Sequence, residues 1–390
     1  MDIELLRSQL LALRGVTEGF PFNAETLAFK VLGKMFAVLP LDKPDRIVLK
    51  CAPAFAKELR SRYAGIQGAY HFNKTHWNEV RFPSDMPAPL MLHLVRHAYA
   101  ITLHGLPKKA QVAFFAEGLP PTLTYRHLNV CDSTQLQIRA LEADYAYTAA
   151  TGSHPATPTF LPAGYLAQSA PLLLSTDLQR AGRGQRGTHW ESGNGKNLLF
   201  SLLLNPVAFP ANRQFLLAQA TALALLDAVS TACYGDSAER LALKWPNDLY
   251  HGDHKLAGML IEHDLQGTHI ARTVIGIGLN VNQATFQSDA PNPVSISAIT
   301  GHEHNRFLLL EAFLHHLDRR LTDAATDAPG LAADYHARLY RRTGLHPYRD
   351  AQGDFRAEIA GVLPDGRLQL RRTDSTLSTY AFKEVQYLPD

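Results

Sequence analysis

The hydrophobic pattern of the first 115 residues predicts a compact unit of mixed helices and strands. Apolar residues recur at helical spacing over 2–13, and β-branched and aromatic runs flank Leu32-Gly33, which predicts a helix followed by a hairpin. The expected strands are 27–31, 34–39, 46–50 and 78–82, and the expected helices are 53–63 and 87–103. A Pro-containing linker over 117–124 ends this unit.

Periodicity after residue 125 predicts a second, larger α+β unit and then a small β domain. Helices are expected at 133–141, 214–231, 308–321 and 331–342, and strands at 172–176, 197–204, 241–244, 249–250, 256–262 and 273–277. Residues 151–171 are rich in Pro, Ala, Thr, Ser and Gly and read as an extended surface loop. From Gly344 the pattern changes to short strands with an Asp365-Gly366 turn, as in a small barrel.

The predicted fold class is therefore α+β, with a largely antiparallel or mixed sheet backed by helices in the larger unit. The predicted organisation is an N-terminal domain at 1–116, a linker at 117–124, a larger domain at 125–343 and a C-terminal β domain at 344–390.

Composition narrows the class of protein. The 390 residues carry a net charge of +2, but residues 1–120 hold 15 Lys and Arg against 10 Asp and Glu. The three cysteines lie far apart, which argues against a zinc ribbon and a disulfide scaffold. The N-terminus has no secretory pattern and no run of about 18 apolar residues occurs, so we expect a cytoplasmic protein without a membrane span.

The strongest chemical signal is the segment 179–190, in which three glycines alternate with three arginines. A glycine-rich backbone can approach an anion closely and offer its N–H groups, and arginine adds a planar fork for phosphate or carboxylate. A basic surface turn is the alternative interpretation.

A second signal is Lys244-Trp245-Pro246-Asn247-Asp248. Lys244 ends an apolar strand, so its ammonium could neutralise a carboxylate or phosphate, although a snorkelling lysine at a strand corner would look the same. A third signal is the glycines within the strands 255–262 and 275–282, which mark either a ligand or close packing.

Taken in this order, these residues resemble the biotin–protein ligase family over about 125–390. The signature GRGxxGxxW runs from Gly182 to Trp190, and KWPND, KLAG and the GxGxN strand end are all present. Asp132-Ser133-Thr134 matches the start of the family's D-S-T-N. The C-terminal domain is similar to that family's SH3-like domain.

The resemblance implies a reaction in two steps: biotin and ATP form biotinyl-5'-AMP, which then biotinylates a lysine of a carboxyl carrier protein. Lys244 and Arg183 would supply the catalytic positive charge, and Mg²⁺ would bridge the phosphates. Biotin contacts carry over to Ser133, Thr134, Gln135, Gln179, Gly182, Arg183, Gly184, Gln185, Lys244, Gly258 and Gly276. Adenylate contacts carry over to Arg183, Arg186, Trp190, Lys244, Asn247 and Asn280, and no residue is assigned as a resident metal ligand.

Two positions depart from the family pattern. Gln135 stands where relatives have Asn, and Gln185 stands where relatives often have an Arg that helps to retain the adenylate. Arg186, the next residue, could supply that charge.

The N-terminal domain resembles a different family, the MmcQ/YjbR-like domains. Its matching stretches include 29–37, 70–78 and Gly105-Leu106-Pro107-Lys108-Lys109. For that family a DNA-binding role has been suggested from its fold, and the basic balance of residues 1–116 is compatible with it. No helix-turn-helix pattern is present, so repression is not carried over.

Two alternatives to a biotin ligase stay open at this point. One is a DNA-binding regulator that senses biotin through its ligase half, and the other is a lipoate–protein ligase.

Overall fold

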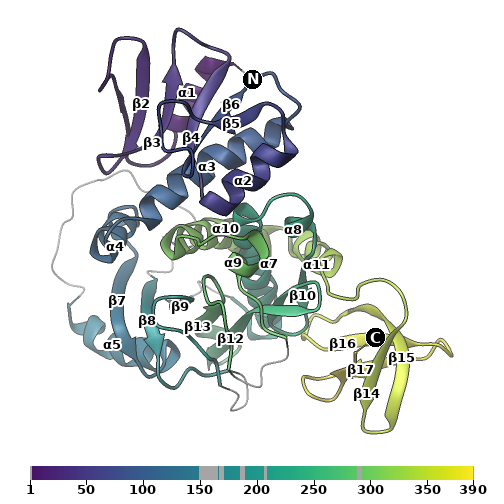
Figure 1. The fold of residues 1–390 in the computed structure, drawn as a ribbon. Helices are drawn as coiled ribbons and strands as arrows, with labels where there is room; N and C mark the ends of the chain where they lie inside the picture. The colour runs from purple at the N-terminus through teal and green to yellow at the C-terminus, as the bar shows by residue number, and fades with distance from the viewer. Residues whose placement is uncertain are drawn as a thin grey trace. The chain divides into compact units, whose positions relative to one another are not determined.

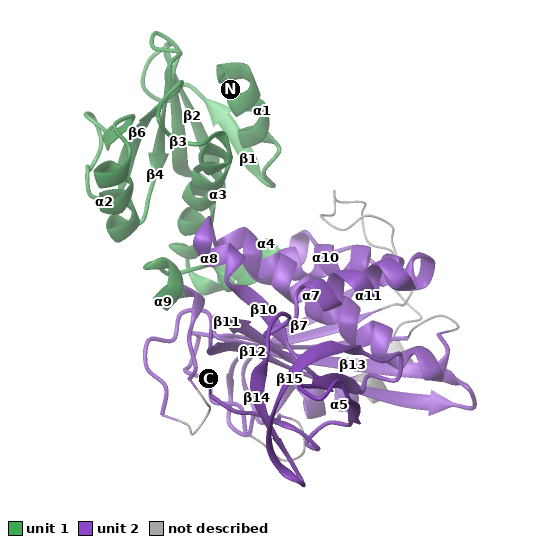
Figure 2. Ribbon diagram, turned by 90° about the vertical axis from the view of Figure 1, so that its right-hand side faces the viewer, with its two compact units in different colours: residues 1–115, 297–308 green, residues 116–296, 309–390 purple. Residues whose placement is uncertain are grey.

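The computed structural model describes residues 2–148, 166, 171–184, 189–205, 209–287 and 292–389, without the side chains of 142–148. Nearly all of the predicted loop at 151–171 lies outside these residues. The chain divides into two compact units (Figure 2). Unit 1 comprises Met1–Phe115 with Ser297–Leu308, and unit 2 comprises Ala116–Ile296 with Leu309–Asp390.

Unit 1 is an antiparallel sheet backed by helices (Figure 1). Its strand order is β1-β2-β3-β4-β6-β5, and helix α3 packs on β2, β3 and β4. Along the chain the elements are α1 (Ile3–Leu11), β1 (Val16–Gly19), β2 (Thr26–Val31), β3 (Lys34–Pro40), β4 (Arg46–Lys50), α2 (Pro53–Arg62), β5 (Ile66–Gly68), β6 (Trp77–Arg81), α3 (Ala88–His104) and α4 (Lys108–Glu117).

The predicted hairpin between β2 and β3 is confirmed. Its turn residues Leu32 and Gly33 have φ values of 47° and 75°, the left-handed conformation that a two-residue hairpin turn requires. The short strands β1 and β5 and the helix α4 were not predicted. The strands carry too few apolar residues to show periodicity, whereas α4 buries only Phe114 and Phe115.

The segment 297–308 belongs to unit 1, although it follows the last strand of the larger sheet in sequence. Its imidazoles join those of α3: the ring centroids of His97 and His302 lie 4.5 Å apart, and those of His302 and His304 lie 4.2 Å apart. His97 Nε2 accepts a hydrogen bond from the Ala52 N–H at 3.1 Å. This histidine cluster, with His93, is packed against the ring of Phe55.

Unit 2 is built on a sheet of order β10-β11-β12-β13-β9-β8-β7, in which β7 and β8 are parallel and the other pairs are antiparallel. This confirms the expected mixed, largely antiparallel sheet. Its elements are β7 (Thr124–Cys131), α5 (Thr134–Thr148), β8 (Leu172–Gln179), β9 (Leu198–Leu204), η2 (Ala211–Arg213), α7 (Gln214–Ala232), α8 (Asp236–Glu239), β10 (Leu241–Lys244), β11 (Asp248–His251), β12 (His254–Gln266), β13 (His269–Leu279), α10 (Arg306–Thr326) and α11 (Ala328–Ala337). Helix α9 (Ile296–Thr300) lies in the segment that belongs to unit 1, except for its first residue, and the first residues of α10 also belong to that segment.

The two faces of this sheet are covered by different helices. Successive side chains of a strand point to opposite faces. Leu203 packs in the same cluster as Ile138 of α5, whereas the ring centroid of Phe200 lies 5.2 Å from that of Phe313 on α10. Helix α5 therefore covers one face and α10 the other. The edge strand β7 was not predicted, because its many polar residues give no regular alternation of apolar and polar positions.

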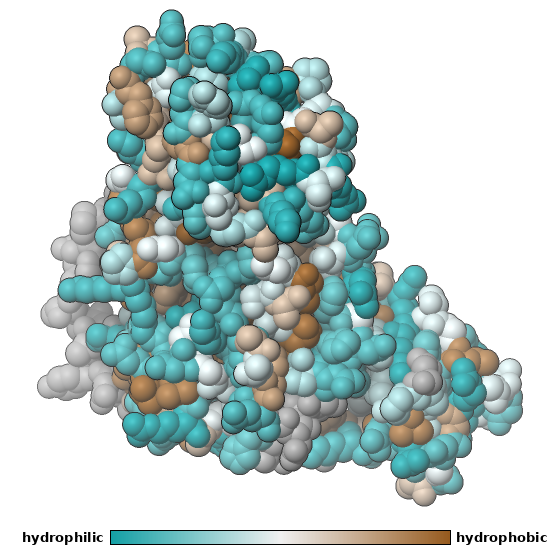
Figure 3. Space-filling view, viewed as in Figure 1, coloured by the Kyte–Doolittle hydropathy of each residue, from teal (hydrophilic) through white to brown (hydrophobic). Residues whose placement is uncertain are grey.

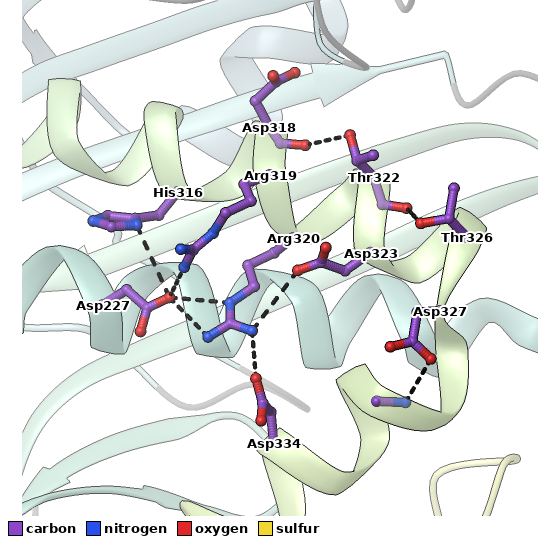
Figure 4. Close-up of polar contacts among 11 residues, drawn as sticks. Asp227, His316, Asp318, Arg319, Arg320, Thr322, Asp323, Thr326, Asp327 and Asp334 are labelled. Atoms are coloured by element: carbon purple, nitrogen blue, oxygen red, sulfur yellow. Dashed lines mark hydrogen bonds and ion pairs between the residues drawn. The ribbon is translucent and has the colours of Figure 1, made fainter.

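An ionic network joins α7, α10 and α11 (Figure 4). The Asp227 carboxylate accepts hydrogen bonds from Arg319 at 2.8 Å and from Arg320 at 3.0 Å. Arg320 also donates to Asp334 at 2.7 Å. The Arg320 side chain is only 12% exposed, so these carboxylates compensate a charge held largely away from water.

The segment Ala211–Ala232, which includes α7, is long and apolar enough to cross a membrane, but 61% of its apolar window is buried inside the protein. Core helices share this length and composition. On the face drawn in Figure 3, hydrophobic residues form small, scattered patches among hydrophilic ones.

The C-terminal residues form a separate antiparallel sheet of order β17-β16-β15-β14-β18. Its strands are β14 (His346–Asp350), β15 (Gly353–Val362), β16 (Leu368–Arg372), β17 (Leu377–Tyr380) and β18 (Gln386–Tyr387). The predicted turn at Asp365-Gly366 joins β15 to β16, and Gly366 has a φ of 88°. The Asp350 carboxylate accepts hydrogen bonds from Arg372 and from the Tyr380 hydroxyl.

Candidate functional site

A cleft of about 970 Å³ lies within unit 2, on the face of the sheet covered by α5. Its lining comes from the start of α5, the ends of β8 and β10, the middle of β12 and β13, and the C-terminal sheet. The lining includes Ser133, Thr134, Gln135, Gln179, Arg183, Gly184, Trp190, Lys244, Asn247, Asp248, Lys255, Gly258, Gly276, Gly278, Asn280 and Tyr387.

One end of the cleft is a polar floor at the first turn of α5. Gln179 Oε1 accepts hydrogen bonds from the Thr134 N–H at 2.8 Å and from the Thr134 hydroxyl at 3.1 Å. The Ser201 hydroxyl lies 2.8 Å from Thr134 Oγ1. The Ser133 hydroxyl is buried, with the residue only 2% exposed, and has no hydrogen-bond partner in the described part of the chain. Because an unpaired buried hydroxyl is costly, this atom marks a place for a polar ligand group.

Gln135 extends this floor across the sheet. Its Nε2 donates to Glu262 Oε2 at 3.1 Å, and its Oε1 accepts from the Ser201 hydroxyl at 3.2 Å. The longer side chain fits because Gly276 lies opposite: a Cβ there would lie 3.2 Å from Gln135 Cδ and closer still to Oε1. The structure thus explains how the Gln135 side chain is accommodated in the floor.

The strand glycines of the cleft hold the ring of Trp190. A Cβ at Gly278 would lie 2.6 Å from Trp190 Nε1, and one at Gly258 would lie 3.1 Å from Trp190 Cζ3. The Trp190 N–H donates to the Gly182 carbonyl at 3.0 Å, which fixes the backbone of this residue. The bare backbone of β12 and β13 therefore accommodates an indole at Gly258 and Gly278, so of the two interpretations of these glycines the structure shows close packing there.

Lys244, at the end of β10, places its ammonium in the same cleft. Its Nζ donates a hydrogen bond to the Tyr250 hydroxyl at 3.0 Å. Burial lowers the pKa of Lys244 from its usual value, with a further decrease from Arg341 and Lys255 and an opposing increase from Asp248. Burial also raises the pKa of Tyr250 well above its ordinary range, so this hydroxyl stays neutral and accepts the hydrogen bond.

The acidic end of the KWPND motif has its own partner. Asp248 Oδ1 pairs with Lys255 Nζ at 2.8 Å, so its ion pair is with the KLAG lysine and not with Lys244. The Asn247 side chain donates to the Met259 carbonyl, and the Met259 N–H donates back to the Asn247 carbonyl at 2.9 Å. The motif is thereby tied to β12.

The glycine- and arginine-rich segment is described only in part. Arg183 is exposed, lines the cleft, and forms a backbone bridge with His189. Gln185 and Arg186 lie outside the described residues. Within the described ranges, no group of three or more His, Cys, Asp or Glu side chains is placed to hold a metal ion.

The cleft brings together most of the residues predicted from sequence, from Ser133 to Asn280. Gly182 lies just outside the lining but contacts Trp190. Sequence reasoning assigned no role to Lys255 and Tyr387, which line the cleft, or to Tyr250, which accepts the Lys244 hydrogen bond. Tyr250 and Lys255 lie beside recognised motifs and could have been found there, whereas no signal marked Tyr387, which the C-terminal sheet supplies.

Two family models match separate parts of the chain. Residues 11–101 match YjbR, and residues 159–280 match the biotin/lipoate A/B protein ligase family.

Individual relatives match part of the chain. The biotin–[acetyl-CoA-carboxylase] ligase of Paracoccus denitrificans is 39% identical over 128 residues, which is 32% of this chain and 52% of that protein. The enzyme of the same name from Mycobacterium tuberculosis is 33% identical over 169 residues, covering 43% and 60%. The chain thus spans between half and two thirds of the length of these relatives.

A solved structure shares the fold. The biotin protein ligase from Aquifex aeolicus in complex with biotin and ATP is 20% identical, with a TM-score of 0.50, and the match covers 68% of this chain and 99% of that one. The likeness is one of fold. Together with the two family models, it shows that this chain carries a YjbR domain at its N-terminus and, after it, a domain of the biotin/lipoate A/B protein ligase family with the biotin-ligase fold.

Proposed function

We propose that this protein is an ATP-dependent biotin–protein ligase, a biotin–[biotin carboxyl-carrier protein] ligase. The observation that carries the proposal is a single cleft that joins the buried, unpaired Ser133 hydroxyl to the Lys244 ammonium. A polar head group and a carboxylate at opposite ends of an apolar chain fit that arrangement.

The polar floor suits the ureido ring of biotin. A ureido group has one carbonyl acceptor and two N–H donors, so it needs both donors and acceptors from the protein. The hydroxyls of Ser133 and Thr134 and the amides of Gln135 and Gln179 offer both kinds of group. Trp190, packed on the backbone of Gly258 and Gly278, would form a wall with the ring and the apolar tail on one side and the adenylate on the other.

In the first step, a biotin carboxylate oxygen attacks the α-phosphorus of ATP. A new P–O bond forms, the bond to the bridging oxygen breaks, and pyrophosphate leaves with that electron pair. Lys244 and Arg183 would offset the repulsion between the two anions and stabilise the charge at the α-phosphate, together with Arg186. Removing one such donor typically costs ~10²–10³ in rate. Asn247 and Asn280 would contact the adenylate.

In the second step, a carrier lysine amine attacks the carbonyl carbon of biotinyl-5'-AMP. The amide bond forms, the amine loses a proton, and AMP leaves. The glycine-rich segment around Gly184 and Gln185 would cover the intermediate and exclude water.

Magnesium enters this proposal only as the complex that ATP brings with it. The described residues do not fit a dedicated metal site, because Asp248 is paired with Lys255 and no cluster of carboxylates faces Lys244.

The proposed partner is the biotin carboxyl carrier domain of a carboxylase, and the proposed compartment is the cytoplasm. We also propose that the sheet of β14–β18 closes into an SH3-like barrel, as the resemblance implies.

The comparisons do not favour the alternative of a DNA-binding regulator, and any DNA contact through residues 1–116 is a secondary proposal. It predicts retention of the full chain on DNA with a steep salt dependence.

Transfer of radiolabelled biotin to a purified carrier domain tests the proposal. Wild type should label the carrier, and Lys244→Ala should reduce adenylate formation ~10²–10³-fold. Lipoate added in excess should not compete. Absence of biotinyl-adenylate from the wild-type chain, with biotin and ATP both supplied, would refute the proposal.

A further inference from the structure

In the described part of the chain, three tyrosine rings surround the Lys244 ammonium. Its Nζ lies 4.6 Å from the ring centroid of Tyr250, 5.0 Å from that of Tyr387 and 5.8 Å from that of Tyr340. All three fall within the range of about 6 Å over which a ring face attracts a cation. We refer to these three residues as the tyrosine cage.

The cage draws on three separate elements. Tyr250 lies on β11, Tyr340 follows α11, and Tyr387 lies on β18. The rings also contact one another, with centroids 5.3 Å apart between Tyr250 and Tyr340 and 6.2 Å apart between Tyr340 and Tyr387. The cage is thus a packed cluster rather than three independent contacts.

Backbone hydrogen bonds fix Tyr340 beside the lysine. The Leu243 N–H donates to the Arg338 carbonyl and the Tyr340 N–H donates to the Leu243 carbonyl, both at 2.8 Å. The Tyr340 hydroxyl donates to Asp253 at 2.6 Å. The chain that leads into the C-terminal sheet therefore runs along β10 next to Lys244.

The C-terminal sheet contributes its ring in a defined way. The Tyr387 hydroxyl is buried and has no hydrogen-bond partner within the described residues. Its contribution near Lys244 is therefore the face of the ring. The neighbouring Trp245 Nε1 donates to the Gly366 carbonyl at 2.8 Å, which ties the KWPND motif to the same sheet.

A cage of aromatic rings can restrain the lysine ammonium without neutralising it, as a carboxylate would. Lysine has a flexible four-carbon stem, so its ammonium must be restrained to act at one atom. A carboxylate partner would restrain it but would cancel the charge needed between two anions. Within the described ranges Lys244 has no carboxylate in ion-pair contact, since Asp248 is held by Lys255. Ring faces restrain a cation and leave its net charge in place.

Building on the function proposed above, we propose that Tyr250, Tyr340 and Tyr387 are positioning residues that hold the Lys244 ammonium for adenylate formation. Through Tyr387, the C-terminal sheet supplies part of the activating site.

The test is single-turnover formation of biotinyl-adenylate by the full chain. Tyr387→Leu should lower the rate roughly tenfold while leaving the biotin Kd within about twofold. Tyr387→Phe keeps the ring and should restore most of the rate. Leu377→Ala, on the exposed surface of β17, is the matched control for substitutions in the C-terminal sheet.

A double-mutant cycle separates positioning from folding. In the Lys244→Ala background, Tyr387→Leu should have no further effect, because the ring acts through that lysine. A wild-type rate for Tyr387→Leu, or the same loss with and without Lys244, would overturn the inference.

Tyr250→Phe provides a second, milder variant if Tyr387→Leu fails to fold. It removes the oxygen that accepts the Lys244 hydrogen bond, so the rate should fall several-fold, and an unchanged rate would contradict the positioning role. If the wild-type chain makes no adenylate, the proposed function itself fails before any variant is compared.

Discussion

Replacing Gly278 with alanine should weaken biotin binding by displacing Trp190. The new Cβ would lie 2.6 Å from Trp190 Nε1 and closer still to Cε2, whereas ordinary contacts begin near 3.4 Å. The indole must therefore move by about 1 Å, which costs about 1–3 kcal/mol as overpacking. Since Trp190 lines the cleft, we expect the biotin Kd to rise roughly 10- to 100-fold.

Calorimetric titration with biotin measures this effect, and a graded series sharpens it. Gly258→Ala places its Cβ 3.1 Å from Trp190 Cζ3, so a shift of only about 0.3 Å suffices and the loss should be smaller. Gly361→Ala, with no heavy atom within 4 Å of its Cβ, is the matched control. Wild-type affinity for Gly278→Ala, or a larger loss for Gly258→Ala, would refute this reasoning.

Gly276→Ala should push the Gln135 side chain out of the polar floor and weaken biotin binding about tenfold. The same calorimetric titration measures this effect, and an unchanged Kd would show that Gln135 does not contact the ligand. Burial lowers the pKa of His93 to about 4 and holds those of His97 and His304 well below 6.5. These rings take up protons more readily when unfolded, so unit 1 should lose stability as the pH falls from about 6.5 toward 4, a trend that thermal unfolding would reveal and that a flat profile would contradict. Asp227→Asn should lower the free energy of unfolding by about 1–2 kcal/mol in denaturant titrations, because it leaves the largely buried Arg320 with fewer carboxylates. The exposed Asp354→Asn should cost under ~1 kcal/mol, and equal losses would refute a special role for the network.

The parts of the fold that sequence reasoning predicted are those with a strong local period. The hairpin at Leu32-Gly33 and the buried strands of the larger sheet are examples. The strands have runs of apolar residues in the sequence, and the turn has its glycine. The edge strand β7 was missed because it is polar and pairs only with β8. The return of residues 297–308 to unit 1 depends on long-range packing, which leaves no local pattern.

The candidate site shows the same division. Residues within recognised motifs, such as Ser133 and Lys244, do line one cleft. The partner of Asp248 could not be read from spacing, because Lys255 reaches it across the β11–β12 pair. The role of Tyr387 could not be predicted, because nothing in a short C-terminal strand indicates that its ring faces a lysine more than a hundred residues earlier.

Unit 1 is made of two separate chain segments, which affects how the protein responds to proteolysis or truncation. The chain passes between the units after Phe115, before Ser297 and within α10, so no single cleavage releases unit 1 whole. A fragment of residues 1–115 lacks the 297–308 segment, and the rings of His97 and Phe55 lose their packing against His302. A protein nicked in the linker should therefore elute from a sizing column as one species under native conditions and as two only in denaturant. An expression plasmid for the ligase region alone would need polar replacements in 297–308 to remain soluble.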